Sequence, residues 1–215
     1  MIVRMRCAGA VVGLALGAWP VAAQRPTLAG SLSFAEHRVD AGFGVERTAG
    51  LIGGAALGGR LGGIDLQAQV RTGRLLLRSA TGTDLEIAEL GLAASWWWRP
   101  WIALRGAALV RGYSADVARQ RWRMAELGAE LRVPFAANRV RGVVRGGWRP
   151  AVTVSGISRP NTAFVAAAGT EYDVTRFSFA IFYELERYDF PSQGGMKRFE
   201  QLSALTLQAR VHAGR

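Results

Sequence analysis

The chain has 215 residues, of which half are apolar, a fifth are charged and 27 are glycine. This length and composition predict one folded domain, or two at most, and exclude a disordered or collagen-like chain. The 27 basic residues exceed the 16 acidic ones by 11, and all of them except Lys197 are arginine. A single cysteine, Cys7, excludes a disulfide framework and a Cys-based zinc site, and the two histidines predict no metal centre.

Residues 1–23 are typical of an export signal. Arg4 and Arg6 precede an uncharged run from Cys7 to Ala23 that ends in small residues. This arrangement predicts cleavage by a signal peptidase near Ala23, so that the mature chain begins at Gln24. The alternative is an uncleaved membrane anchor, although the 17 uncharged residues fall short of the roughly 20 that a spanning helix needs.

From residue 28 onward, apolar and polar side chains alternate with a period of two, which predicts β-strands. In the segment from Phe177 to Glu186, for example, Phe179, Ile181 and Tyr183 share one face and the two glutamates share the other. The same pattern predicts ten strands, at residues 28–37, 49–60, 64–78, 85–98, 101–113, 121–133, 140–154, 163–172, 177–189 and 199–212.

The predicted connections differ in length from one end of the strands to the other. Short turns are predicted at 61–63, 99–100, 134–139 and 173–176, and generally longer polar loops at 38–48, 80–84, 114–120, 155–162 and 190–198. Short turns on one side, longer loops on the other and an even strand number are typical of bacterial outer-membrane barrels. The sequence therefore predicts an all-β fold: an antiparallel up-and-down transmembrane β-barrel of about ten strands, with eight possible, over residues 24–215.

Two observations favour an apolar face that points outward into lipid. Charges on this face occur near the loop ends of the strands, at Arg74, Glu86, Arg123 and Arg187, where a charge facing lipid costs about 0–1 kcal/mol. Aromatic residues also cluster at two heights, which predicts two membrane-interface belts. The belts comprise Trp96, Trp98, Trp101, Phe135, Tyr172 and Phe177 near the turns, and Phe34, Tyr113, Trp148, Phe164 and Tyr183 towards the loops. The alternative is a secreted soluble β-barrel that binds a small apolar ligand.

With this pattern the segment from Leu28 to His212 resembles the small bacterial outer-membrane β-barrel proteins, in the broad sense of OmpA-, OmpX- and OmpW-like barrels. The resemblance implies a monomer in the bacterial outer membrane, with membrane lipid and the barrel assembly machinery as partners. It departs at the C-terminus, because such barrels usually end in an aromatic residue and this chain ends in Val211-His-Ala-Gly-Arg. Arginines in the predicted loops suit the phosphates of lipopolysaccharide.

The polar face of the strands carries eight arginines and eight acidic residues, which predicts a lumen filled by ion pairs because unpaired buried charges are costly. The predicted charge network comprises Glu89, Arg105, Arg111, Glu126, Glu130, Arg141, Arg145 and Glu184. Neighbouring strands would place Arg105 and Arg111 near Glu89 and Glu126, and Arg141 and Arg145 near Glu126 and Glu130. The alternatives are a selective channel and a catalytic carboxylate pair.

The sequence predicts no enzymatic activity, no cofactor and no nucleic-acid partner. Outer-membrane proteases of this shape use clustered Asp and His residues near the outer rim, and lipid A deacylases use a His-Ser-Glu set. Here His37 stands alone near the loops and is predicted to be solvated. We therefore predict a barrel of structural, surface-interaction or small-pore type with a largely closed lumen. A rim-site hydrolase is a further alternative.

Overall fold

A computed structural model describes residues 24–42, 44–80, 82–115, 119–135 and 139–213 of the chain. The predicted signal segment, residues 1–23, lies outside the described residues, and its cleavage stays a prediction. Within the described ranges, no helix is long and apolar enough to cross a membrane.

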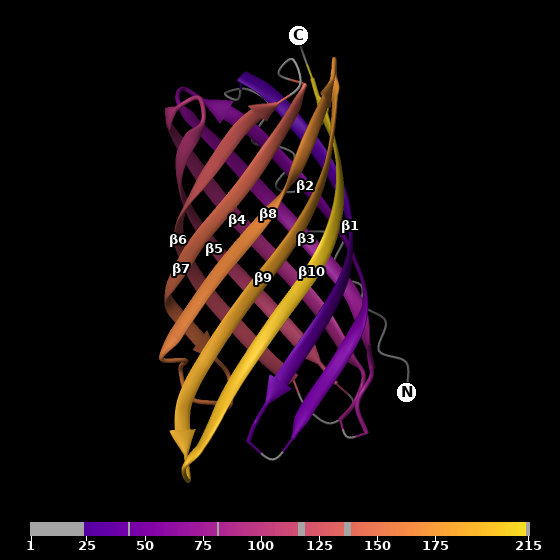
Figure 1. The fold of residues 1–215 in the computed structure, drawn as a ribbon, viewed down its shortest axis with the longest axis vertical. Coiled ribbons are helices and arrows are strands. Elements are labelled where there is room, and N and C mark those ends of the chain that lie inside the picture. Colours follow the sequence, from indigo (N-terminus) through magenta and orange to yellow (C-terminus); the bar gives the residue numbers. More distant parts are fainter. Residues whose placement is uncertain (1–23, 43, 81, 116–118, 136–138, 214–215) are drawn as a thin grey trace.

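Ten antiparallel strands form one closed barrel, as the sequence predicted (Figure 1). The strands are β1 (Gln24–Asp40), β2 (Val45–Leu61), β3 (Ile64–Leu77), β4 (Leu85–Arg99), β5 (Ile102–Ser114), β6 (Arg119–Phe135), β7 (Val140–Val154), β8 (Thr162–Val174), β9 (Phe177–Gln193) and β10 (Met196–His212). Each strand pairs with its neighbours in sequence, and β1 pairs with β10 from Thr27↔His212 to Asp40↔Phe199. This last ladder closes the sheet, so that no strand edge is left unpaired.

The strands have an apolar outer face and a mixed inner face. On β10, Leu207 points outward and is 55% exposed, whereas Thr206 points into the barrel and is 4% exposed. The predicted belt residues Trp96, Trp98, Trp101, Trp148, Phe177 and Tyr183 all lie on the outer surface. An apolar exterior is the reverse of what a soluble ligand-binding barrel requires.

Several predicted loops are in fact continuations of the strands. Residues 190–198 were predicted as a loop, but β9 and β10 run on until only Gly194 and Gly195 separate them, and their hairpin extends past the other strands in Figure 1. Both glycines have positive φ, as tight hairpin turns require. Crossing the hydrocarbon needs about 9–11 residues of a tilted strand, so a strand of 17 residues extends beyond it. Polar residues in such an extension resemble a loop in sequence although their backbone is paired.

Candidate functional site

The interior of the barrel is divided along its axis into three parts. At the loop end lies an aromatic and apolar cluster, below it lies an ion-pair network, and at the turn end lies an open cavity. We call the network the loop-side network, and it comprises Arg71, Glu89, Arg111, Glu126, Arg149, Glu184 and Glu186. The cavity, which we call the turn-side vestibule, is described below.

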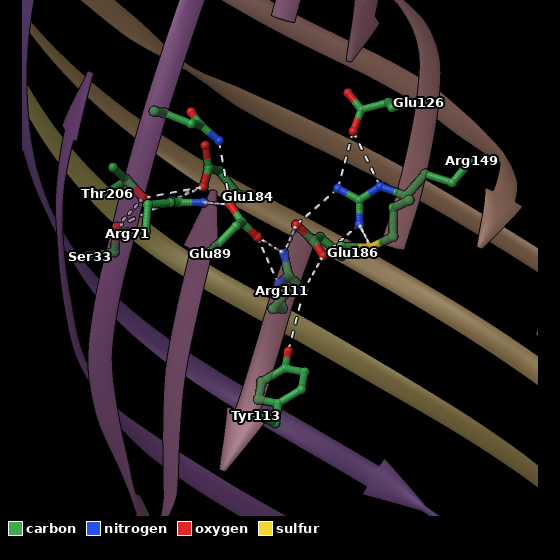
Figure 2. Close-up of polar contacts among 12 residues, drawn as sticks. Ser33, Arg71, Glu89, Arg111, Tyr113, Glu126, Arg149, Glu184, Glu186 and Thr206 are labelled. Carbon is green, nitrogen blue, oxygen red and sulfur yellow. Dashed lines mark hydrogen bonds and ion pairs between the residues drawn. The ribbon is translucent and has the colours of Figure 1, made fainter. Parts of the chain in front are cut away.

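Glu186 on β9 is the centre of the loop-side network (Figure 2). Its carboxylate accepts hydrogen bonds from both terminal nitrogens of Arg111 on β5, each at 2.8 Å. It also accepts hydrogen bonds from Arg149 on β7, at 2.8 and 3.1 Å, and from the hydroxyl of Tyr188, at 2.8 Å. Two bidentate contacts to one carboxylate fix both guanidinium planes.

Each of the two arginines has a second carboxylate partner. Arg111 donates its Nε to Glu89 at 2.7 Å, and Arg149 donates Nε and Nη2 to Glu126 at 3.3 and 3.1 Å. The side chains of Arg111 and Arg149 are only 1% and 3% exposed. At this burial an unpaired guanidinium would be strongly destabilising, so the two partners per arginine account for the stability of charges in the barrel centre.

On the other side of the lumen, Arg71 on β3 lies between Glu89 on β4 and Glu184 on β9. It donates to Glu184 at 2.8 Å and lies 3.9 Å from Glu89. Nearby, Ser33 and Thr206 share a hydrogen bond of 2.8 Å across the closing β1–β10 seam. Figure 2 shows these groups converging from opposite walls of the barrel.

The turn-side vestibule is a cavity of about 670 Å³ bordered by the β2–β3, β4–β5 and β8–β9 turns. Its charged strand residues are Arg60, Asp65, Arg99, Arg105, Glu130, Arg132, Arg141, Arg145, Glu171, Asp173 and Arg210. A separate cavity of about 120 Å³ lies in the middle of the lumen, between the vestibule and the loop-side network. Water can therefore occupy the turn end of the lumen, whereas the middle offers little free space.

Three arginines of the predicted network lie near carboxylates that the sequence analysis expected beside them. The structure brings Arg111 to Glu89, and Arg145 donates to Glu130 at 2.6 Å. Arg105 lies 3.8 Å from Glu126.

Arg141 was expected near Glu126 or Glu130, and this pairing is wrong. Its guanidinium instead contacts Glu171 at 3.4 Å and Asp173 at 2.5 Å. The reason is register, because Arg141 stands directly opposite Glu171 on β8.

The loop end of the lumen is filled by an aromatic cluster that the sequence analysis missed. Trp122 on β6 is 1% exposed and packs edge-on against Tyr113, Tyr188 and Phe190, with ring centroids 4.8–6.2 Å apart. Such contacts add to the apolar area that the rings bury. We call Tyr113, Trp122, Tyr188 and Phe190 the aromatic plug.

Two sequence predictions about this region are wrong. Tyr113 was placed in the outer belt, but it points inward and is 6% exposed. His37 was expected to be solvated, but its ring stacks on Tyr113 at 4.9 Å and its Nε2 lies 3.5 Å from Glu200. Both side chains lie on inward-facing positions of strands that continue beyond their predicted ends, to Asp40 and Ser114.

Glu186 and Arg149, which form the centre of the network, were recognised as lumen-facing residues but not as part of its core. Their alternation with apolar neighbours identifies the face, whereas their mutual contact depends on which distant strands meet across the barrel. Among the described residues, no group of three or more His, Cys, Asp or Glu side chains could hold a metal ion.

Comparison with known proteins supports the architecture. No protein-family model and no curated protein sequence matches the chain. Among solved structures, the outer membrane protease OmpT from Escherichia coli superposes with a TM-score of 0.62 at 11% identity, covering 88% of this chain and 97% of that one. The chain has the fold of outer-membrane β-barrel proteins.

Two further structures match with lower scores. The β domain of the Bordetella autotransporter BrkA gives a TM-score of 0.49 at 15% identity, covering 87% of this chain and 98% of that one. Neisserial surface protein A gives 0.40 at 11% identity, with coverages of 86% and 96%.

Proposed function

We propose that the protein is a bacterial outer-membrane barrel with a closed lumen, acting in membrane structure or surface interaction and not in general diffusion. Its apolar outer face supports the membrane location, because exposed side chains such as Leu90, Leu127 and Leu207 would be costly to expose to water around the whole circumference. The aromatic belts would lie at the two headgroup regions. Insertion would require the barrel assembly machinery.

The closed lumen is supported by two barriers that follow one another along the barrel axis. The aromatic plug fills the loop end, and the loop-side network bridges opposite walls directly beneath it. The turn-side vestibule of about 670 Å³ lies at the turn end, and the mid-lumen cavity is only about 120 Å³. A solute would have to displace both buried ion pairs and packed rings to pass.

Planar-bilayer recording of single-channel conductance tests this proposal. The unmodified protein is expected to be silent or to show rare small openings. A double variant with Arg111→Ala and Glu186→Ala should conduct more, because it removes one charge of each sign from the centre and leaves Arg149 paired with Glu126. Large and steady currents from the unmodified protein would refute the closed lumen.

A matched control removes an ion pair outside the barriers. Arg60 and Asp65, which form a 2.8 Å contact near the turns, are both changed to Ala. This control carries the same change in charge and should stay as silent as the unmodified protein. Equal leakage from both double variants would show that the barrel as a whole has loosened, and would count against a specific barrier.

We further propose that anionic lipid headgroups, such as lipopolysaccharide phosphates, bind the outer face of β6. Arg119, Arg121 and Arg123 alternate along its loop end, are all exposed, and are therefore spaced by about 7 Å on one face. Within the described ranges none of the three has an acidic partner, and the opposite β5 residues Gly112 and Val110 are uncharged. Arginine forks at this height suit phosphate groups.

This partner is tested by refolding into vesicles with and without lipopolysaccharide. Lipopolysaccharide should raise the unfolding temperature of the unmodified protein, and replacing the three β6 arginines with Gln should abolish the rise. Lys197→Gln, an exposed charge at the β9–β10 hairpin, serves as the control and should keep it. An unchanged rise in the triple variant would contradict the proposed contact.

The proposal assigns no enzymatic activity, and a rim-site hydrolase is the alternative to be tested. One observation bears on it: His37 and Glu200 form a contact at 3.5 Å beneath the loops. Their side chains are 7% and 2% exposed, and the histidine ring is covered by Tyr113. A substrate arriving from the loop side would not reach them without rearrangement, so we infer a structural role. Peptidase or esterase activity that His37→Ala abolishes in a correctly folded barrel would establish the alternative.

A further inference from the structure

Charge is distributed unevenly along the lumen. The loop-side network holds three arginines against four glutamates, whereas the strand residues of the turn-side vestibule comprise seven arginines against four carboxylates. The vestibule therefore carries a formal excess of three positive charges. Because the plug and the network close the other end, this positive cavity is accessible only from the turn side.

Part of the excess arises because one carboxylate contacts two arginines. Glu130 accepts hydrogen bonds from the Nε of Arg132 and from the Nε of Arg145, both at 2.6 Å. Glu171 lies 3.4 Å from Arg141 and 3.5 Å from Arg210. One negative charge neutralises one guanidinium, so the Glu130 group keeps one positive charge. In the second group Asp173 also pairs with Arg141, at 2.5 Å, which leaves Glu171 to Arg210. The remaining surplus comes from Arg99 and from Arg105, whose partner Glu126 belongs to the loop-side network.

Two arginines have only distant carboxylate partners. Arg105 lies 3.8 Å from Glu126, and Arg149 contacts the same carboxylate at the shorter distance of 3.1 Å. Arg210 has its nearest carboxylate contact at 3.5 Å and a 3.3 Å contact to the amide oxygen of Gln208. Hydrogen bonds between charged groups are normally 2.7–2.9 Å long, so both arginines have unused capacity to donate.

These arginines lie together at the inner end of the vestibule. Arg105, Arg145 and Arg210 line both the vestibule and the smaller mid-lumen cavity. The positive charge of Arg145 repels those of Arg105 and Arg210. Keeping the three charges together without an anion therefore costs electrostatic free energy.

Aromatic rings hold the flanking guanidinium groups in place. Arg145 stacks over Phe182 at 4.8 Å, and Arg132 stacks over Trp97 at 4.5 Å. Both donate their Nε to Glu130 and both line the cavity, so their terminal nitrogens are not used in these two hydrogen bonds. A fixed fork loses little conformational entropy when it binds an oxyanion.

We propose that the turn-side vestibule is a binding site for a small anion that carries two or more negative charges on phosphate or carboxylate groups. Two or more negative charges suit the formal excess of three positive charges, and oxygen acceptors match the guanidinium forks of Arg105, Arg145 and Arg210. The volume of about 670 Å³ lies within the range of small-molecule sites, roughly 300–1,000 Å³. This site goes beyond the structural role proposed above and does not depend on the conductance of the barrel.

Titration calorimetry with sodium pyrophosphate tests the site on the full barrel in a non-ionic detergent, at an ionic strength held constant with chloride. The unmodified protein should bind pyrophosphate saturably with one site per chain. The double variant Arg105→Gln and Arg210→Gln should bind at least about tenfold more weakly, the loss expected for removing two charged donors. Arg78→Gln, an exposed charge at the loop end outside the cavity, should bind like the unmodified protein.

A second variant separates the geometry of the donors from their charge. Arg105→Lys with Arg210→Lys keeps both charges but loses the forks, and should bind several-fold more weakly than the unmodified protein. A heat-dependent shift in gel mobility verifies that each variant is folded. Absence of saturable binding to the unmodified protein would overturn the proposal whatever the variants do. Equal affinity in the Arg105/Arg210 double Gln variant, or heats that follow ionic strength alone, would overturn it as well.

Discussion

Changing Glu186 to Gln removes the central charge of the loop-side network while keeping the shape of the side chain. In the structure this carboxylate accepts four hydrogen bonds from two arginines that are almost fully buried. Loss of one partner from a buried ion pair costs about 3–5 kcal/mol, and Gln would also direct an NH2 group at a guanidinium. Because Arg111 and Arg149 keep Glu89 and Glu126, we expect the lower value, about 3 kcal/mol.

The assay is unfolding by urea from lipid vesicles, followed by tryptophan fluorescence and by gel mobility. Glu86→Gln is the matched control, because Glu86 lies on the outer face at the loop end of β4 and is exposed. A surface change of this kind should stay within about 0.5 kcal/mol of the unmodified protein. A stability of the Glu186 variant equal to that of the control would refute the idea that buried pairing holds the lumen together.

Two further predictions concern the outer face and the loops. Leu207→Arg, which places a charge on the lipid face, should destabilise the barrel by about 2–4 kcal/mol. Thr206→Arg should instead destabilise it through crowding beside the network. If Leu207→Arg leaves the stability measured by vesicle unfolding unchanged, the two faces are assigned the wrong way round. The pKa of Asp84 is lowered by the hydrogen bond from the backbone N–H of Leu77 and by its contact with Arg74. A lowered folded-state pKa stabilises the protein above the unfolded value of about 3.9 and loses this contribution as the pH falls below it. The stability difference between the unmodified protein and Asp84→Asn should therefore be constant near neutral pH and shrink in acid, and a difference that grows on acidification would contradict the assignment.

The alternation of side chains was sufficient to predict the barrel, because a period of two assigns each residue to a face. It placed Trp96 and Leu207 outside and Glu89 inside, and it located all ten strands. It failed at the strand ends beyond the membrane, where the outer face has no need to be apolar. Tyr113 was placed in the outer belt against this pattern, because it has the same parity as Arg111, which was assigned to the lumen, and it lies on the inner face of β5.

Contacts across the lumen could not be predicted from the sequence. Neighbouring strands predict pairs such as Arg145 with Glu130, which stand opposite each other in the β6–β7 register. The contact between Arg111 on β5 and Glu186 on β9 joins strands separated by three others in the sheet. It depends on the width of the barrel and on the tilt of its strands, and neither follows from the pattern of one strand and the next.

Those long-range contacts give β9 a particular role in the architecture. Backbone hydrogen bonds connect β9 only to β8 and β10, but its Glu184 and Glu186 reach Arg71 on β3, Arg111 on β5 and Arg149 on β7. The two glutamates therefore connect walls that the sheet itself does not connect, and they do so with charges shielded from bulk water. In the closed lumen that we propose, a solute would have to displace these same side chains in order to pass. The pairing that permits charge inside this barrel would then be the same pairing that closes it.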